Sequence, residues 1–164
     1  NEVNKDSIRF MMLNRSNDVE LDFDFDKVKE KTKDNPVFYV QYAYARINSI
    51  IRMLNKKLSD NISINNKNFS PNKYEKKIIK KIFEWPKVIE SASNKFEPHK
   101  IPFYLYELST LFHSYWSKGN ENNEYKFIVN GKIKRNESLI FIYLTAIVIE
   151  KGMSILGVSL PEKM

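Results

Sequence analysis

A stripe of aliphatic residues at helical spacing runs through residues 35–58 and constrains the fold more than any other feature of the sequence. Asn35 followed by Pro36 is a typical helix start, because Asn caps the first turn and Pro fits its first position. The stripe is formed by Val40, Ala43, Ile47, Ile50 or Ile51, Leu54 and Leu58. A long helix with one apolar flank needs other helices to cover that flank.

Similar signals predict helices elsewhere in the chain. The expected helical segments are residues 5–15, 35–58, 70–85, 86–95, 98–118 and 136–156, with a short helical turn at 27–33. We expect a break or a turn of the helix at Trp85 and Pro86, Gly119 as the end of a helix, and a short strand at 125–129. The predicted fold class is therefore all-α, a bundle of about five to seven helices.

The composition fits one helical domain and excludes several other classes. The chain has 164 residues, of which 42% are hydrophobic, with Gly 4 and Cys 0. A core of ordinary size is available, whereas disulfides and thiolate metal sites are impossible. The longest apolar run, residues 139–149, is shorter than the about 20 residues that cross a bilayer. We therefore expect a buried helix there and no membrane partner.

The sequence carries no pattern of a catalytic or metal site. His99 and His113 would lie roughly 21 Å apart on one helix, so they cannot share a metal ion. We expect His113 to be a packed or hydrogen-bonded histidine. No glycine-rich phosphate loop occurs, and no nucleophile is paired with a base. The chain is thus expected to hold no catalytic residue, no metal and no cofactor of its own.

The charge balance is basic, with a formal net charge of +7 and a pI near 9.4. Basic domains often bind polyanions, but an excess of Lys, Asn and Ile can also follow from genome composition. One side of the helix expected at 70–85 carries Lys73, Lys76, Lys77, Lys80 and Lys81. This face is either solvated or in contact with an RNA backbone, and the pattern alone favours the solvated face.

A second line of side chains follows the edge of the aliphatic stripe. Tyr39, Tyr42 and Arg46 each precede a residue of the stripe, so they lie about 100° around the helix from it. Two rings and a guanidinium can stack on unpaired bases and hydrogen-bond to them. The alternative is that both rings complete the core while Arg46 forms a salt bridge, and the pattern alone favours this alternative.

Several segments together resemble the arginyl-tRNA synthetase family, and they occur in the family's order. Residues 35–46 read Asn-Pro-Val-Phe-Tyr-Val-Gln-Tyr-Ala-Tyr-Ala-Arg and resemble its NP-x-[FY]-Y-x-QYA-x-[AS]-R signature. Residues 97–114 contain Glu-Pro-His, Tyr-Leu-Tyr-Glu-Leu and Phe-His-Ser, which resemble one helix of bacterial members. Residues 152–164 resemble the family's closing G-[LM]-x-x-LG-[VL]-x-x-PE-[RK]-M.

Two further matches lie near the start of the chain. Residues 6–9 stand where the family has the Asp-Ala-Leu-Arg element that names its anticodon-binding domain, with departures at Ser7 and Ile8. Residues 21–26 resemble the LDFDLD stretch that follows. The resemblance implies that residues 1–34 are the C-terminal edge of the catalytic region and its junction, and that residues 35–164 are an anticodon-binding helical bundle.

The resemblance also implies a parent enzyme, an arginine–tRNA ligase that uses ATP with Mg²⁺. Its HIGH-type and KMSKS-type ATP-binding signatures do not occur in this sequence, and the chain begins with Asn1. We therefore expect a fragment that is inactive alone and holds no cofactor. The expected partners are tRNA(Arg) and the upstream catalytic domain, in the cytoplasm, with the protein as a monomer.

Five positions that contact the anticodon in the family match residues of this chain. These residues are Tyr39, Tyr42, Arg46, Trp116 and Met164. Trp116 stands where Tyr is commoner, so the stacking face is kept while the polar group moves to the indole N–H. Two alternative functions remain, a helical protein–protein adaptor and a non-specific RNA-binding helical module, and neither would need the line of Tyr39, Tyr42 and Arg46 to read a base.

Overall fold

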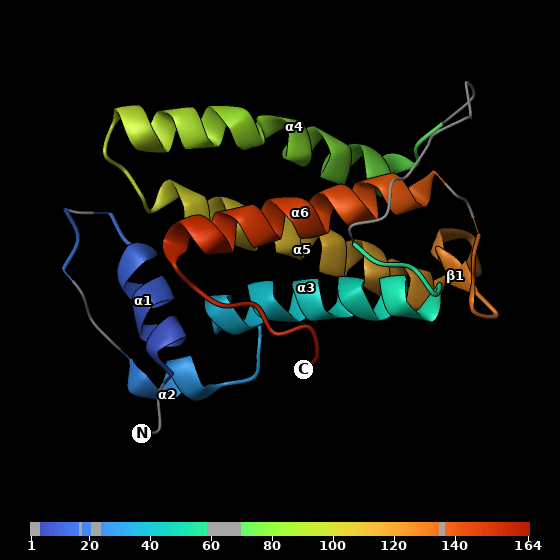
Figure 1. Ribbon diagram of the computed structural model, residues 1–164, viewed down its shortest axis with the longest axis horizontal. Coiled ribbons are helices and arrows are strands. Elements are labelled where there is room, and N and C mark those ends of the chain that lie inside the picture. The colour runs from blue at the N-terminus through green and yellow to red at the C-terminus, as the bar shows by residue number, and fades with distance from the viewer. Residues whose placement is uncertain (1–3, 17, 21–23, 59–69, 135–136) are drawn as a thin grey trace.

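The computed structural model describes residues 4–16, 18–20, 24–58, 70–134 and 137–164. Within these ranges most residues are helical, and the helices pack together as a bundle (Figure 1). The helices are α1 (Lys5–Leu13), α2 (Phe25–Lys29), α3 (Pro36–Met53), α4 (Lys73–Asn94), α5 (Lys100–Glu121) and α6 (Ser138–Leu156). The predicted all-α bundle of five to seven helices is confirmed.

The two outer helices, α3 and α4, begin at caps that the sequence specifies. Asn35 accepts a backbone hydrogen bond at 3.3 Å from the first turn of α3, where Pro36 sits as predicted. The Asn35 amide also donates to the carbonyl of Val28 at 2.7 Å, which ties α3 to α2. α4 begins with a capping box, in which the side chains of Asn72 and Glu75 each accept from the other's backbone N–H.

α6 is the central helix of the bundle. It contacts α1, α3, α4 and α5, while α3 and α4 lie on opposite sides of α5 and α6 (Figure 1). By length and composition alone α6 could cross a membrane, but 61% of it is buried inside the bundle. Its fully buried side chains include Ile142, Ile149 and Met153. The predicted buried helix is therefore the core helix of the domain.

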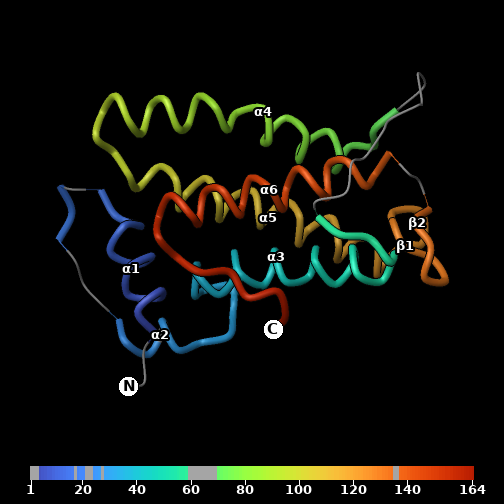
Figure 2. The backbone as a smooth tube through the Cα atoms, viewed as in Figure 1, coloured from blue at the N-terminus to red at the C-terminus, as the bar shows by residue number. Residues whose placement is uncertain are grey.

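Of the break or turn expected at Trp85 and Pro86, the break into two helices is wrong. α4 continues from Lys73 to Asn94 with Pro86 in its interior, and Figure 2 shows the helix axis bending part-way along. Proline removes one backbone donor and displaces the carbonyl four residues earlier, which bends a helix without always ending it. Pro86 is on the exposed side, while Ile78 and Ile82 pack into the core on the other side. That packing keeps the helix continuous.

The expected helix end at Gly119 is also wrong, because α5 continues to Glu121. Gly119 is buried, and a Cβ at this position would lie 3.3 Å from the carbonyl oxygen of Tyr125. The missing side chain therefore allows the following segment to cross α5 closely. That segment forms the short helix η1 (Asn123–Tyr125) and the antiparallel strands β1 (Ile128–Val129) and β2 (Lys132–Ile133).

The C-terminal tail that follows α6 is fastened to both α1 and α3. The carboxylate of Asp6 in α1 accepts from Ser159 N at 3.1 Å, and Gln41 of α3 donates to the Ser159 carbonyl at 2.9 Å. Further along, Arg52 donates to the carbonyl of Glu162 at 3.1 Å. The tail therefore runs across α3 in a fixed position (Figure 1).

Candidate nucleic-acid interface

A row of aromatic and cationic side chains lies where α3 and α5 pack together. This aromatic row consists of Tyr39, Tyr42, Arg46, Tyr106, His113 and Trp116. On α3, Arg46 Nη2 donates to Tyr42 Oη at 2.5 Å, and the guanidinium carbon lies 4.4 Å from the centre of the Tyr42 ring. Arg46 therefore bonds to a neutral partner here. The alternative in which both tyrosine rings complete the core had expected Arg46 to form a salt bridge.

His113 of α5 connects the members of the row that belong to α3. Its ring centre lies 4.4 Å from that of Tyr39 and 5.5 Å from that of Tyr42. Nδ1 of His113 is 3.1 Å from Arg46 Nη1, and Nε2 is 3.2 Å from the carbonyl oxygen of Tyr39. The prediction of a packed, hydrogen-bonded histidine is confirmed, and its partners on α3 are the three residues that the sequence placed on one line.

The surroundings of His113 keep its ring neutral. Arg46 has only donors, so Nδ1 must accept, and Nε2 carries the proton that is donated to the Tyr39 carbonyl. Burial lowers the pKa of His113 to about 4, with the positive charge of Arg46 as a smaller cause. The positive charge of the row near neutral pH therefore belongs to Arg46.

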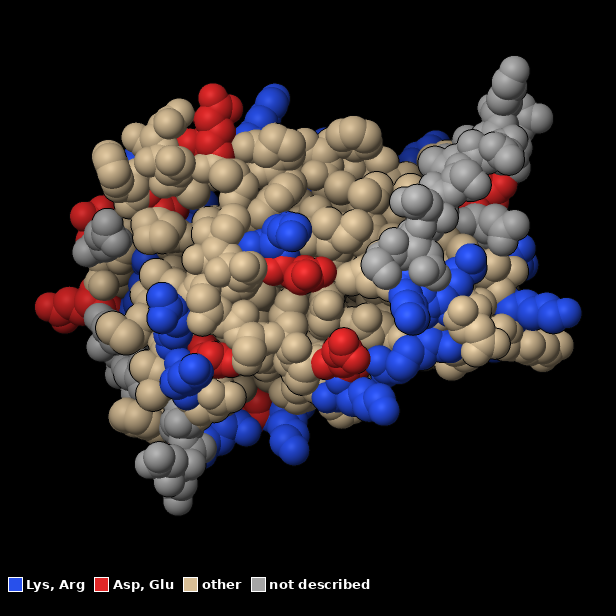
Figure 3. Space-filling model, viewed as in Figure 1, with Lys and Arg blue, Asp and Glu red and all other residues tan. Residues whose placement is uncertain are grey.

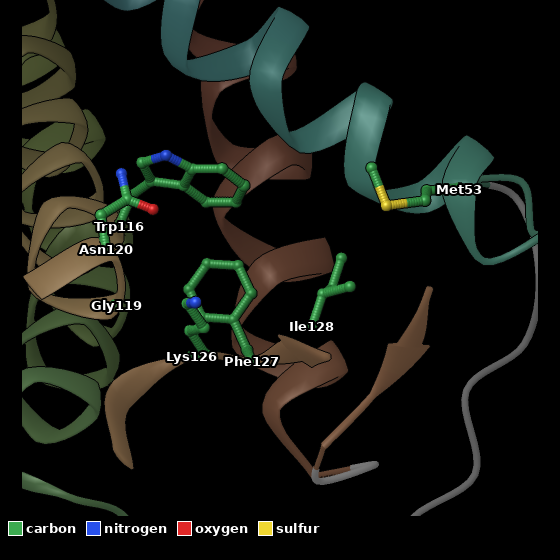
Figure 4. Close-up of a pocket in the computed structure, with 7 residues that line it drawn as sticks. All are labelled: Met53, Trp116, Gly119, Asn120, Lys126, Phe127 and Ile128. Carbon is green, nitrogen blue, oxygen red and sulfur yellow. The ribbon is translucent and has the colours of Figure 1, made fainter. Parts of the chain in front are cut away.

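Trp116 extends the row beyond Arg46 to a hollow. The guanidinium carbon of Arg46 lies 5.2 Å from the centre of the Trp116 ring. The hollow has a volume of about 180 Å³, and Figure 4 shows Trp116 and Phe127 on one side of it, with Met53 opposite. Gly119, Asn120, Lys126 and Ile128 complete its lining. An apolar slot with a ring face and a few polar groups suits a flat heterocycle.

At its other end the row continues through Tyr106. The ring centres of Tyr106 and Tyr39 are 5.3 Å apart, and the Tyr106 hydroxyl donates to the carbonyl of Lys33 at 3.2 Å. Burial raises the pKa of Tyr39, with Tyr106 as a second cause, so its hydroxyl stays protonated at neutral pH. The row thus offers ring faces, hydroxyls and one guanidinium along one junction of helices, the chemistry that binds unpaired bases.

Comparison with known sequences decides the family. Residues 40–164 match the family described as the DALR anticodon binding domain, so the match includes most of the chain. The chain belongs to the DALR anticodon-binding domain family. Tyr39 immediately precedes the matched region, and the other members of the aromatic row lie within it.

The relatives of this DALR domain are much longer proteins. The arginine–tRNA ligase of Pelagibacter ubique is 55% identical over 163 residues, which are 99% of this chain and 28% of the relative. The arginine–tRNA ligase of Rickettsia rickettsii is 43% identical over 178 residues, which are 100% of this chain and 30% of the relative. The chain therefore spans less than a third of the length of these two relatives.

Solved structures give the same fold. The arginyl-tRNA synthetase of Campylobacter jejuni superposes with a TM-score of 0.83 at 28% identity, covering 99% of this chain and 34% of that one. The Thermus thermophilus arginyl-tRNA synthetase gives a TM-score of 0.70 at 23% identity, over 96% of this chain and 26% of that one. At 23% identity, the match to the Thermus thermophilus structure shows a common fold and nothing more.

The DALR domain brings four of the five expected site residues together and leaves the fifth apart. Tyr39, Tyr42, Arg46 and Trp116 belong to the aromatic row, whereas Met164 is 54% exposed at the end of the tail. In the described part of the chain, no hydrogen bond or ring contact joins Met164 to that row. Gln41 and Arg52, which hold the tail, lie on a different flank of α3 from the row.

Sequence reasoning did not identify two members of the row as site residues. The aromatic pattern groups Tyr106 with the core, and it predicts only a structural role for His113. A usable signal exists on α5, since Tyr106, His113 and Trp116 recur at intervals of seven and three residues and therefore share one flank. Phe127 could not be assigned this way, because it reaches the hollow from the segment that crosses Gly119.

Proposed function

We propose that this chain recognises the anticodon loop of tRNA(Arg) as part of an arginine–tRNA ligase. Its family membership and the names of its relatives support this function. The observation that carries the proposal is the aromatic row itself, in which Arg46 is bonded to Tyr42 and His113 and lies near Trp116. Because the side chains of such a row are already ordered, bases that leave their stack can bind to it without a further entropic cost for ordering the protein.

The proposed roles of the site residues follow from their chemistry. Tyr39, Tyr42 and Trp116 offer ring faces on which bases stack, and Arg46 adds donors for acceptor atoms on base edges. Arginine anticodons have C in the middle, and a splayed cytosine presents an N4 amine that donates. We assign the backbone carbonyls near Met164 as acceptors for that amine, which gives the short fixed tail a part in reading the loop.

The remaining features of the parent protein are proposed from its relatives. We assign residues 35–164 to the anticodon-binding bundle and residues 1–34 to the junction with an upstream catalytic domain. That domain would bind ATP with Mg²⁺ and join arginine to the tRNA. The parent enzyme would act in the cytoplasm as a monomer. The partners of this chain would be tRNA(Arg) and the upstream catalytic domain of the same enzyme.

The test is a low-salt titration of the chain against an arginine anticodon stem-loop. The control RNA is the same stem-loop with G in place of the middle C. The test variant of the protein is Tyr42→Ala in the row, and the control variant is Phe83→Ala on α4. Phe83 is 78% exposed, and its helix α4 lies on the far side of α5 and α6 from α3, so its removal controls for the loss of a surface ring. The proposal expects a preference for the C loop that Tyr42→Ala loses and Phe83→Ala keeps.

Two results would count against this function. Equal affinity for both loops would reduce the chain to a basic helical surface without sequence readout. Unchanged preference in Tyr42→Ala would move the readout away from the aromatic row. A thermal melt of each variant accompanies the titration, so that a loss of binding is not confused with unfolding.

A further inference from the structure

A second and wider hollow lies at the C-terminal end of α3, where the tail crosses it. Its volume is about 630 Å³, and α3, the segment after it, α6 and the tail all line it. Its lining includes four basic residues, here called the α3-end cations: Arg52, Lys56, Lys57 and Lys151. Figure 3 shows Lys and Arg side chains gathered on this face beside the tail. The lining contains two carboxylates, those of Glu150 and Glu162, so the charge of the hollow is net positive.

The backbone after α3 turns two of these cations toward solvent. Asn55 adopts a φ of 53°, in the left-handed region that Asn tolerates. Lys56 N donates to the carbonyl of Ile51 at 3.0 Å, which closes the turn. The chain therefore reverses directly after α3, and Lys56 and Lys57 are left exposed beside the hollow.

Arg52 is held in place by neutral groups. Its Nη2 donates to the hydroxyl of Ser49 at 3.0 Å, and its Nη1 donates to the carbonyl of Glu162 at 3.1 Å. Among the ion pairs formed by the described residues, none involves Arg52 or Lys56. The guanidinium is therefore oriented but not neutralised, and such a group suits an anionic oxygen.

The α3-end cations adjoin the hollow beside Trp116. Met53 follows Arg52 in the sequence and lines that hollow, so the last turn of α3 contributes to both hollows. We propose that the α3-end cations bind the phosphates that flank the anticodon bases held by the aromatic row and the Trp116 hollow. The inference rests on the proposed function, because it assumes that a single RNA strand occupies that row.

The lysine face of α4 does not fit this role. Its members Lys73, Lys76, Lys77 and Lys80 are exposed, but α4 lies on the far side of α5 and α6 from α3 (Figure 1). Lys81, the fifth lysine of that face, pairs with Glu84 and Glu107. Of the two alternatives for this face, the solvated one therefore fits the arrangement, and the RNA backbone contact moves to the α3-end cations.

A pair of double variants tests the proposal. Lys56→Ala with Lys57→Ala and Lys76→Ala with Lys77→Ala each remove two neighbouring lysines, so each lowers the formal net charge of +7 by two. Each variant is titrated with the arginine anticodon stem-loop at several salt concentrations. The Lys56/Lys57 variant should bind the stem-loop about tenfold more weakly in low salt. The slope of its log binding constant against log salt concentration should become less steep by about 0.7 for each phosphate that it no longer neutralises. The Lys76/Lys77 variant should match the unaltered chain in both quantities.

The outcomes separate this inference from the proposed function. If both double variants weaken binding equally, affinity follows net charge alone and the α3-end cations are not a site. If the Lys56/Lys57 variant keeps the slope and affinity of the unaltered chain, the inference is overturned while the preference for the C loop can still stand. If the unaltered chain binds neither loop at any salt concentration, the proposed function and the inference are both overturned.

Discussion

The guanidinium of Arg46 lies over the ring of Tyr42, with 4.4 Å between the guanidinium carbon and the ring centre. Tyr42 precedes Arg46 by one helical turn. The same guanidinium donates to the Tyr42 hydroxyl at 2.5 Å and contacts His113 Nδ1 at 3.1 Å. One planar cation thus fixes two side chains on two helices. Its second ring neighbour is Trp116, so the arrangement depends on the shape of the guanidinium as well as its charge.

Replacing Arg46 by Lys tests that dependence on shape. Arg46→Lys keeps the charge but loses the planar fork, so His113 and Tyr42 lose a shared donor. We expect affinity for the arginine anticodon stem-loop to fall at least about tenfold, which is about 1.4 kcal/mol. The log–log salt slope should not change, because the net charge is the same. Fluorescence titration measures both, and equal affinity of Arg46→Lys and the unaltered chain would contradict the prediction.

The neutral state of His113 makes the stability of the domain depend on pH. The folded-state pKa is about 4, below the ordinary 6.5, so the unfolded chain binds a proton between these values and the folded chain does not. Stability is therefore complete above pH 6.5 and falls as the pH decreases toward 4. Between pH 6.5 and pH 5 the loss should be on the order of 1 to 2 kcal/mol.

His113→Gln is the matched variant for this pH effect. The Gln amide can accept from Arg46 and donate to the Tyr39 carbonyl, as the neutral imidazole does, but it does not titrate. Urea unfolding at pH 7 and pH 5 should show a smaller loss of stability in His113→Gln than in the unaltered chain. A loss of equal size in both proteins would mean that other groups cause the pH dependence.

The residues of α3 in the candidate site could be predicted because their arrangement is local. Spacing of three and four residues on one helix places Tyr39, Tyr42 and Arg46 together, whatever the helix packs against. The bonds of Arg46 to His113 depend instead on how α5 packs against α3. The spacing of residues along one helix does not determine how two helices pack. The sequence therefore left open whether Arg46 pairs with a carboxylate or with neutral groups.

The two wrong expectations in the fold have the same origin. Pro86 and Gly119 are helix-ending residues by their backbone chemistry, and local patterns alone predict helix ends there. The structure keeps both inside helices, Pro86 on an exposed side and Gly119 where the following segment crosses closely. Tertiary packing therefore overrode the local preference, whereas the capped start at Asn35 needed no such context.

Asp6 and Arg9, in the segment that resembles the family's naming element, hold the end of α6 and the C-terminal tail. Asp6 accepts from the backbone N–H of Ser159 at 3.1 Å and from its hydroxyl, and Arg9 donates to the carbonyl of Leu156 at 2.7 Å. Both residues lie on α1, within one turn of each other. The element thus connects the start of the chain to the segment that carries Met164.

Asp6→Asn should loosen this connection. The side chain keeps its size but replaces one acceptor oxygen of a 3%-exposed group with an amide donor, which faces the donors of Ser159. We expect a loss of about 1 to 3 kcal/mol of unfolding free energy, measured by urea denaturation. Asp26→Asn, on an exposed turn of α2, is the control and should change stability little. Similar values for the two variants would show that Asp6 does not fasten the tail.

Removal of Lys163 and Met164 should affect RNA binding but not folding. Among the described residues, the tail hydrogen bond to α3 that lies nearest the chain end is the one from Arg52 to the Glu162 carbonyl, so the deletion starts beyond it. The melting temperature and helicity should therefore be unchanged. Affinity for the arginine anticodon stem-loop should fall if the chain end reads the middle C. Lys163→Ala, which removes the same charge and keeps Met164, should retain the preference for C over G. Equal preference in the deletion and in Lys163→Ala would exclude a role for Met164 in readout.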